Sequence, residues 1–436
     1  MSAPHETAST PQRSATFREV FAVREFRPLF GTFLLSTAGD ELARVALTVL
    51  VYQRTNSPLL SALTFAIGFL PWLLGGPVLS ALADRLPRHR VLIAADTTRA
   101  LLLGVMAIPG TPLAVLLVLM FLVALCTPPF ESARSALMAD VLEGDRYAVA
   151  ISLTNISLQL AQVLGFLLAG ALITALDPSA ALLIDAATFA ITALWLTRGL
   201  QRRPAPLAEG ERRSLLQDTG EGLRFIGRSP RLLAIVSILW LATLFGYASE
   251  GVAAPLVHEL GEGTTALGAL LAANPLGVTI GGLVIARLVA PGRRERLVVP
   301  LVVLSLAAVL AAGLVGRYGP PGIGTFALVV ALLFVSGLGA SWLIPLNVSF
   351  VQAVPSAFRG RAFGVAVSGL YGVQGIGMLA AGLLAEGFAP TEVVAVSGGL
   401  GLIVVAPALV AYRRTQGHRS QDHMAGDDPA AGPSTS

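Results

Sequence analysis

Residues 59–108 read LLSALTFAIGFLPWLLGGPVLSALADRLPRHRVLIAADTTRALLLGVMAI and set the pattern for the whole chain. Two long apolar runs, 59–83 and 91–108, are separated by a short turn that carries most of the charge. About 20 apolar residues in a helix cross the roughly 30 Å hydrocarbon core of a bilayer. The stretch therefore predicts two membrane-spanning helices joined by a tight charged turn.

The composition of the whole chain is that of a membrane protein. Of 436 residues, 54% are hydrophobic and 13% are charged, and the mean hydropathy is +0.74. A chain with so few polar residues cannot coat a water-soluble globule, which excludes a soluble enzyme, a nucleic-acid-binding protein and a secreted disulfide scaffold. The single cysteine, Cys126, cannot form an internal disulfide.

Apolar windows of similar length recur along the chain, each bounded by charged residues or by Pro and Gly. Twelve candidate spans result: 29–52, 59–83, 91–108, 113–130, 148–176, 180–197, 232–257, 265–289, 297–315, 322–345, 362–385 and 393–412. The sequence therefore predicts an all-α integral membrane protein with twelve transmembrane helices.

All 30 basic residues are arginine, and their distribution predicts the topology. With an even number of spans both termini lie on one side, and 26 arginines fall in the termini and loops of that side. Only Arg54 and Arg317 fall in the other loops, while Arg44 and Arg99 lie within spans. Because cytoplasmic loops are enriched in basic residues, we expect a protein of the cytoplasmic membrane with both termini in the cytoplasm. The basicity reflects topology, so no nucleic-acid partner is expected.

The longest polar segment divides the spans into two sets of six. We expect a cytoplasmic N-terminal segment over 1–28, six-helix bundles over 29–197 and 232–412, a linker over 198–231 and a disordered cytoplasmic tail over 413–436. Residues 214–227 of the linker suit either a short interfacial helix or a solvated connection. No cleavable leader is expected, because residues 1–16 are polar.

The two halves are weakly similar in sequence. A shift of 206 residues lays 75–92 on 281–298 with six identities in 18 positions, and both segments form the turn after the second span of their half. Such parallel repeats are typical of transporters in which two bundles rock about a central site.

The turn after the second span resembles the cytoplasmic signature of the major facilitator superfamily of secondary transporters. Residues 76–90, GPVLSALADRLPRHR, hold its small residue, its Asp-Arg pair and its Arg-rich turn, although Ser80 and Pro87 stand where glycine is common. The resemblance covers nearly the full length and implies the major facilitator fold with alternating access. It also implies a gating role on the cytoplasmic side for four residues: Asp84, Arg85, Arg88 and Arg134.

Finer features resemble the branch of that family with macrolide-efflux and siderophore-export carriers. The segments that carry this resemblance are 96–100, 129–140, 354–355 and 359–361. The family's antiporter signature is degraded in the fifth span to GFLLAG at 165–170, so antiport does not rest on that motif.

Ionisable residues within membrane spans are costly and mark candidate functional sites. The first half holds six of them: Asp40, Glu41, Arg44, Asp96, Arg99 and Asp185. Glu41 and Arg44 are three residues apart, as are Asp96 and Arg99, and this helical spacing predicts two ion pairs. Arg44 is also four residues from Asp40. Since four carboxylates face two arginines, at least one acid lacks a fixed counter-charge and suits proton coupling. We expect Asp40 and Glu41 to serve that purpose, while Asp96 with Arg99 suits a neutralised structural network.

The second half offers Glu250, in the seventh span, for contact with a proton or a cationic substrate, with a structural contact as the alternative. Asp185 is expected near the outer interface, where a solvated carboxylate needs no special role. Several aromatic residues provide surface for an apolar ligand, with packing or lipid contact as the plainer role: Trp72, Trp240, Phe245, Tyr247, Trp342 and Tyr371.

These features predict a secondary active transporter for a small hydrophobic or amphipathic compound. Proton-coupled efflux is the expected mode, and an uptake carrier of the same fold is the alternative. A polytopic membrane enzyme is disfavoured, because the five histidines are scattered and neither an Asp-rich metal motif nor a Walker-type loop occurs. We expect a monomer whose partners are the lipid bilayer, a small-molecule substrate and protons, with no cofactor and no metal.

Overall fold

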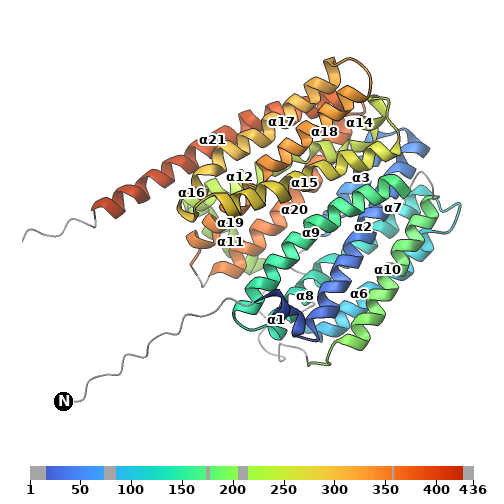
Figure 1. Ribbon diagram of the computed structural model, residues 1–436, viewed down its shortest axis with the longest axis horizontal. Coiled ribbons are helices and arrows are strands. Elements are labelled where there is room, and N and C mark those ends of the chain that lie inside the picture. Colours follow the sequence, from blue (N-terminus) through green and yellow to red (C-terminus); the bar gives the residue numbers. More distant parts are fainter. Residues whose placement is uncertain (1–15, 73–84, 173–176, 205–214, 356–357, 426–436) are drawn as a thin grey trace, which may run out of the picture.

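The computed structural model describes residues 16–72, 85–172, 177–204, 215–355 and 358–425, and every regular element in these ranges is a helix (Figure 1). The N-terminal half contains α1 Phe17–Ala22, α2 Phe26–Thr55, α3 Pro58–Ala66, α6 Arg88–Met106, α7 Leu113–Leu125, α8 Thr127–Val141, α9 Asp145–Leu172 and α10 Pro178–Gly199. The linker contains α11 Leu215–Arg228. The C-terminal half contains α12 Pro230–Gly246, α13 Ala248–Gly251, α14 Ala253–Glu259, α15 Thr264–Leu288, α16 Pro291–Arg294, the 3₁₀ helix η1 Glu295–Leu297, α17 Val298–Tyr318, α18 Ile323–Ala340, α19 Leu343–Ala353, α20 Arg359–Leu384 and α21 Pro390–Ala425.

The helices begin and end where local chemistry permits. Ser57 is the N-cap of α3 and is followed by proline, and Ser229 with its following proline begins α12 in the same way. Both serine hydroxyls accept a hydrogen bond from a first-turn backbone N–H, which satisfies a group that the helix leaves without a partner. Asn56 ends α2 with φ of 50°, a left-handed conformation that asparagine tolerates. The resulting turn between α2 and α3 is very short.

Nine helical segments among the described residues are long and apolar enough to cross a membrane, and they correspond to the fourth to twelfth expected spans. The first and third spans are present as α2 and α6, but their central charged residues lower their hydropathy. The second span begins with α3, and the rest of it includes residues 73–84, which lie outside the described residues. The expected all-α membrane fold is confirmed.

Two boundaries differ from expectation. The fourth span was expected to end at residue 130, but the paired prolines begin α8, so the helical segment continues to Val141. Proline is tolerated in the first turn of a helix because the missing N–H has no intrahelical partner there. Helix α21 continues past Tyr412 to Ala425, into the expected tail. The linker contains a helix, α11, which is the first of its two expected forms.

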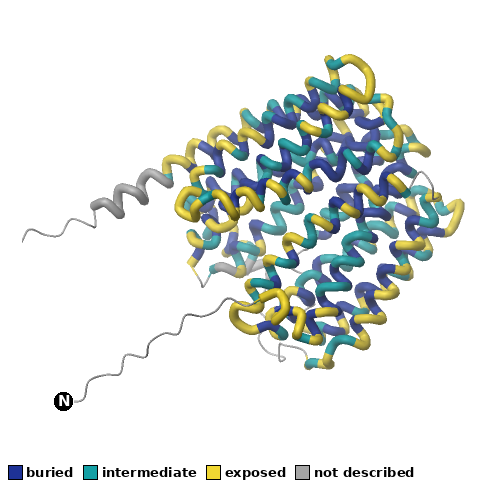
Figure 2. The backbone as a smooth tube through the Cα atoms, in the orientation of Figure 1, coloured by how far each residue is buried: buried dark blue, intermediate teal, exposed yellow. Residues whose placement is uncertain are grey.

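The surface and the core identify the lipid-facing side. Figure 2 shows exposed residues both at helix ends and along the outward faces of the long helices. Many of these outward residues are large and apolar, including Leu101, Leu164, Ile191 and Ile403. Exposed apolar side chains along whole helices match a hydrocarbon environment rather than water.

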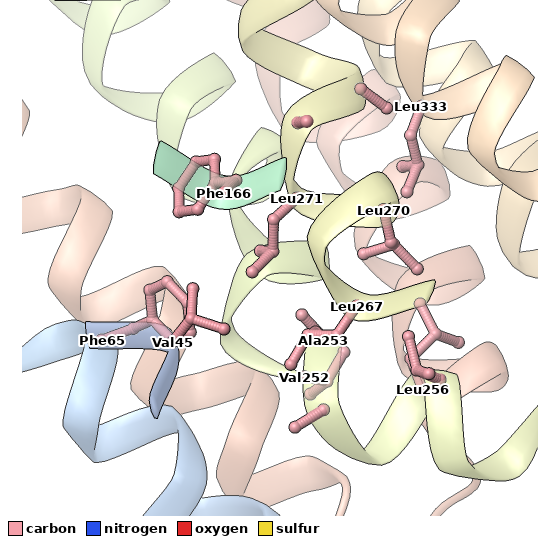
Figure 3. Packing of buried hydrophobic residues seen from close by; sticks show 14 of the residues in the cluster. Val45, Phe65, Phe166, Val252, Ala253, Leu256, Leu267, Leu270, Leu271 and Leu333 are labelled. Carbon is pink, nitrogen blue, oxygen red and sulfur yellow. The ribbon is translucent and has the colours of Figure 1, made fainter. Parts of the chain in front are cut away.

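Buried apolar residues join the two halves at one end of the bundle. We call the end that holds α1, α11 and α16 the linker end, and the other the opposite end (Figure 1). One core cluster combines Val45, Phe65 and Phe166 of the N-terminal half with Leu256, Leu271 and other residues of the C-terminal half (Figure 3). The other four clusters among the described residues each belong to one half. The described packing between the halves is thus strongest toward the opposite end.

Candidate functional site

A buried ion pair connects α6 to its neighbours in the N-terminal half. Arg99 Nη1 lies 3.5 Å from Asp96 Oδ1, and both side chains are almost fully buried. The Thr192 hydroxyl of α10 donates to Asp96 Oδ2 at 2.7 Å. The Arg99 guanidinium also lies 4.8 Å from the ring centre of Phe130 and 5.1 Å from that of Phe189. These contacts hold α6 against α8 and α10, which suits a structural network.

Asp185 lies elsewhere than expected. It was placed near the outer interface, yet its residue is only 1% exposed, inside the N-terminal bundle. Gly39 of α2 makes room for it, since a Cβ on Gly39 would lie 2.3 Å from Asp185 Oδ1. The Thr188 hydroxyl donates to the same oxygen at 3.2 Å, and Asp40 is a charged neighbour. The inward orientation of Asp185 could not be predicted from the sequence, because it depends on which face of α10 meets α2.

The structure adds Glu131 to the charged groups of this half. Glu131 lies in α8, where Arg134 Nη2 donates to its Oε2 at 2.6 Å. The Arg134 guanidinium lies 4.1 Å from the ring centre of Phe33 in α2. Arg134 was expected in a cytoplasmic loop as a gating residue, but it is buried in a helix. A fourth span extended past the prolines would have included both Glu131 and Arg134.

The first two proton-coupling candidates lie in the middle of α2. Glu41 is 3% exposed and accepts a hydrogen bond from Arg44 Nη1, with 3.1 Å from this nitrogen to Oε2. Gln162 of α9 lies beside the Glu41 carboxylate. Asp40 is half-buried and has Arg99 and Arg44 as charged neighbours. Within α2, the spacing therefore produces one direct ion pair, between Glu41 and Arg44.

Glu250 is the charged residue of the C-terminal half that faces this pair. It lies in the short helix α13, and its charged neighbours are Glu41 and Arg44 of the other half. Tyr247, at the junction of α12 and α13, is close to Glu250 and Tyr371. The three charged residues together span the boundary between the two halves near the middle of the bundle. We call Glu41, Arg44 and Glu250 the central charge group.

Aromatic residues from both halves lie beside the central charge group. Tyr371 of α20 lies with its ring centre 6.1 Å from that of Phe69 and 4.9 Å from that of Trp72, both on the second span. The Arg44 guanidinium lies 6.0 Å from the Phe69 ring centre. The other aromatic candidates pack within the C-terminal core: Trp240, Phe245 and Trp342.

The gating residues lie at the linker end where they are described. Asp84 lies outside the described residues, and Arg85 is exposed. Arg88 forms an ion pair with Asp140 of α8, which connects α6 to the end of the fourth span. The gating role of these residues stays a prediction.

One cavity among the described residues is remote from the central charge group. It has a volume of about 650 Å³ and lies between α17 and α18 at the opposite end, lined by residues such as Tyr318 and Leu328. Its lining contains no acidic or basic side chain, so the charged residues mark the candidate site instead. Within the described residues, no group of three or more His, Cys, Asp or Glu side chains is arranged to hold a metal ion.

Two six-helix halves with buried charges at their boundary define a polytopic membrane transporter rather than an enzyme. The sequence model of the Major Facilitator Superfamily matches residues 29–316 and 239–431, so the chain belongs to this family.

Comparisons with individual proteins agree with this assignment. The chain is 27% identical over 373 residues to the multidrug efflux pump Tap of Mycolicibacterium fortuitum, covering 81% of this chain and 87% of Tap. It is 28% identical over 211 residues to the uncharacterized MFS-type transporter YfiS of Bacillus subtilis (strain 168), covering 47% of this chain and half of YfiS.

Solved structures show the same fold at low sequence identity. The nucleoside transporter NupG matches with a TM-score of 0.71 and 14% identity over 88% of this chain and 100% of that chain. A POT family transporter in complex with 5-aminolevulinic acid matches with a TM-score of 0.73 and 14% identity over 92% and 98%.

Proposed function

We propose that this protein is a proton-coupled efflux carrier for a small hydrophobic or amphipathic compound. The observation that carries the proposal is the central charge group, in which Glu250 of one half faces Glu41 and Arg44 of the other. Buried ionisable groups are costly within a membrane and are retained where a proton or a substrate passes. A carboxylate at a boundary between moving halves changes its surroundings when the halves rock, which is what coupling requires.

The orientation follows from the arginine distribution. Because 26 of 30 arginines fall in the termini and loops that the sequence predicts on the cytoplasmic side, we place the linker end and both termini in the cytoplasm. The opposite end, where apolar residues of both halves pack together, then faces outward. This arrangement closes the outer side of the central charge group. Alternating access requires this packing to separate when the carrier releases its substrate outside.

The central charge group contains two carboxylates and one arginine, so protonation of a carboxylate can change the contacts of the arginine. Arg44 neutralises Glu41 in the described state. Protonation of either carboxylate changes which acid Arg44 faces, because a neutral acid attracts the guanidinium less than a carboxylate does. We propose that Glu41 and Glu250 each gain and lose a proton during transport. We also propose that Asp40 is a further proton site beside them. An uptake carrier of the same fold is the alternative, since the geometry is compatible with both directions.

The experiment that tests this function is accumulation of a panel of fluorescent and antibiotic compounds in expressing cells. We expect lower accumulation with the wild-type protein than in cells without it, and loss of this difference with an uncoupler. Glu41→Gln is expected to raise accumulation to the level of non-expressing cells, whereas Glu143→Gln, at an exposed acid in the turn after α8, serves as the matched control. Equal accumulation in all arms would contradict efflux of these compounds. Higher accumulation in expressing cells would favour uptake.

A further inference from the structure

The backbone is irregular around Glu250. Helix α12 ends at Gly246, α13 covers only Ala248–Gly251, and α14 begins at Ala253. The two junction residues have non-helical dihedral angles, with φ −90° and ψ 4° at Tyr247 and φ −106° and ψ 17° at Val252. Interrupted helices within a membrane occur where the protein lines a cavity or a binding site. The interruption therefore marks this segment independently of its charge.

The central charge group has one acid more than it has bases. Arg44 Nη1 contacts both carboxylate oxygens of Glu41, at 3.3 and 3.1 Å. Among the described residues, Glu250 forms no ion pair, and its carboxylate accepts no hydrogen bond. An ionised carboxylate away from water is expensive unless a positive partner compensates it. The site thus lacks one positive charge, which a proton or a bound cation supplies.

The surfaces next to Glu250 suit an organic cation. Tyr247 lies close to the carboxylate and to Tyr371, and the Tyr371 ring contacts the Trp72 ring at 4.9 Å between centres. These aromatic side chains and Glu250 are each only partly buried, although they lie inside the bundle. Aromatic faces attract ammonium and phosphonium groups as well as apolar rings. A metal ion is a poorer fit, because the described residues offer no cluster of three acidic, His or Cys ligands.

We propose that this site binds a monovalent amphipathic organic cation, with Glu250 as its anchoring charge and Tyr247, Trp72 and Tyr371 as its apolar walls. This proposal rests on the proposed function and specifies its substrate class. The cation and a proton satisfy the same carboxylate, so they exclude each other at Glu250. The charged and titratable groups that face this carboxylate are Glu41, Arg44 and Tyr247. Tyr371, next to Tyr247, has Glu131 and Arg134 as its own charged neighbours. A neutral compound of the same shape leaves Glu250 uncompensated and binds more weakly.

The test is equilibrium binding of two probes of similar shape to the purified full-length protein. Methyltriphenylphosphonium carries one positive charge, whereas triphenylphosphine oxide is neutral and has an oxygen in place of the methyl group. We expect the wild-type protein to bind the cation about tenfold more tightly than the oxide, which corresponds to about 1.4 kcal/mol. Glu250→Gln should remove this difference by weakening only cation binding, Glu250→Asp should keep part of it, and Glu143→Gln should match the wild type. Gel filtration and thermal unfolding establish that each variant is folded.

Equal affinity of the wild-type protein for both probes would overturn the proposal, as would an unchanged affinity ratio in Glu250→Gln. The wild-type comparison needs no variant, so it decides the matter even when Glu250→Gln fails to fold. Uncoupler-sensitive efflux of neutral compounds, together with equal probe affinities, would remove the cation site and leave the proposed function intact. Absence of any transport together with a normal cation preference would remove the proposed function and leave the binding site.

Discussion

Glu386 of the C-terminal half caps the first turn of α3 in the N-terminal half through Ser57. Its Oε1 accepts hydrogen bonds from Ser57 Oγ at 2.5 Å and from Leu59 N at 3.0 Å. Ser57 is itself the N-cap of α3, and the N-terminal end of a helix favours a negative charge. The two halves also pack closely next to this contact, where a Cβ on Gly382 of α20 would lie 2.3 Å from Ala62 Cβ of α3. The contact therefore joins the two halves at the opposite end.

Breaking this contact should favour opening of the opposite end. Ser61 on α3 is fully buried, so Ser61→Cys, in a Cys126→Ser background, reports opening through labelling by a membrane-impermeant maleimide. We expect Glu386→Gln to accelerate labelling about fivefold, since hydrogen bonds to a charged group contribute about 1.5–3 kcal/mol and part of this is screened at an exposed site. Glu262→Gln, in the turn between α14 and α15 at the same end, is the control. Unchanged labelling in Glu386→Gln would show that the contact does not restrain opening.

The same contact predicts a specific pH dependence. The Ser57 hydroxyl and the Leu59 N–H hold the pKa of Glu386 below its ordinary value. A carboxylate with a lowered pKa stabilises the closed contact above its ordinary pKa of about 4.3, and this stabilisation is lost as pH falls through the lowered value. The labelling rate of Ser61→Cys, divided at each pH by the rate of the same variant with Glu386→Gln added, should therefore stay constant from about pH 8 to about pH 5 and increase only at more acidic pH. The division removes the pH dependence of the thiol itself, because only the thiolate reacts with maleimide. An increase near neutral pH that depends on Glu386 would contradict this assignment.

The space at Gly39 should be essential for the N-terminal bundle. A methyl group on Gly39 would lie 2.3 Å from Asp185 Oδ1 and 2.7 Å from Thr188 Oγ1, so both side chains must shift. We expect Gly39→Ala to lower the free energy of unfolding by about 1–3 kcal/mol, as overpacking of a core does. Gly104 of α6 is the matched control, because no atom lies within 4 Å of its added Cβ. Gly104→Ala should be neutral or stabilising by up to about 1 kcal/mol in thermal unfolding. Equal melting temperatures for the two variants would refute the contact.

The pair Asp96 and Arg99 should behave as a structural unit. Removing one partner leaves a buried charge, so Arg99→Gln alone should cost about 3–5 kcal/mol of stability. The double variant Asp96→Asn with Arg99→Gln replaces the pair by neutral groups of similar shape and should recover much of this loss. Thermal unfolding of the wild type, the two single variants and the double variant measures the coupling. Additive losses would show that the two residues stabilise the bundle independently.

Much of the fold follows from the sequence because hydropathy and charge act along the chain. The spans, the charged turn before α6 and the neighbours at three-residue spacing depend only on local periodicity. The end of the fourth span was wrong because Pro128 and Pro129 suggest termination, whereas the structure uses them in the first turn of α8. Glu131 was missed for this reason.

The site depends on contacts that the sequence does not encode locally. Glu41 and Glu250 are more than 200 positions apart, and their proximity arises from the packing of two halves. Glu386 has no distinguishing context in the sequence, since its role depends on the position of Ser57 in the other half. The prediction for Asp185 was wrong because its side chain fits against α2 only where a glycine of that helix leaves room. Such relationships require the tertiary arrangement.

Proton movement in proteoliposomes tests the central claim most directly. A pH-sensitive dye inside the vesicles records proton flux while a compound identified in the accumulation panel is transported. We expect the wild-type protein to move protons opposite to the compound, and Glu41→Gln and Glu250→Gln to abolish this flux while Glu143→Gln retains it. Transport of the compound by the wild-type protein with no proton flux, at a rate independent of the pH gradient, would contradict coupling through the central charge group.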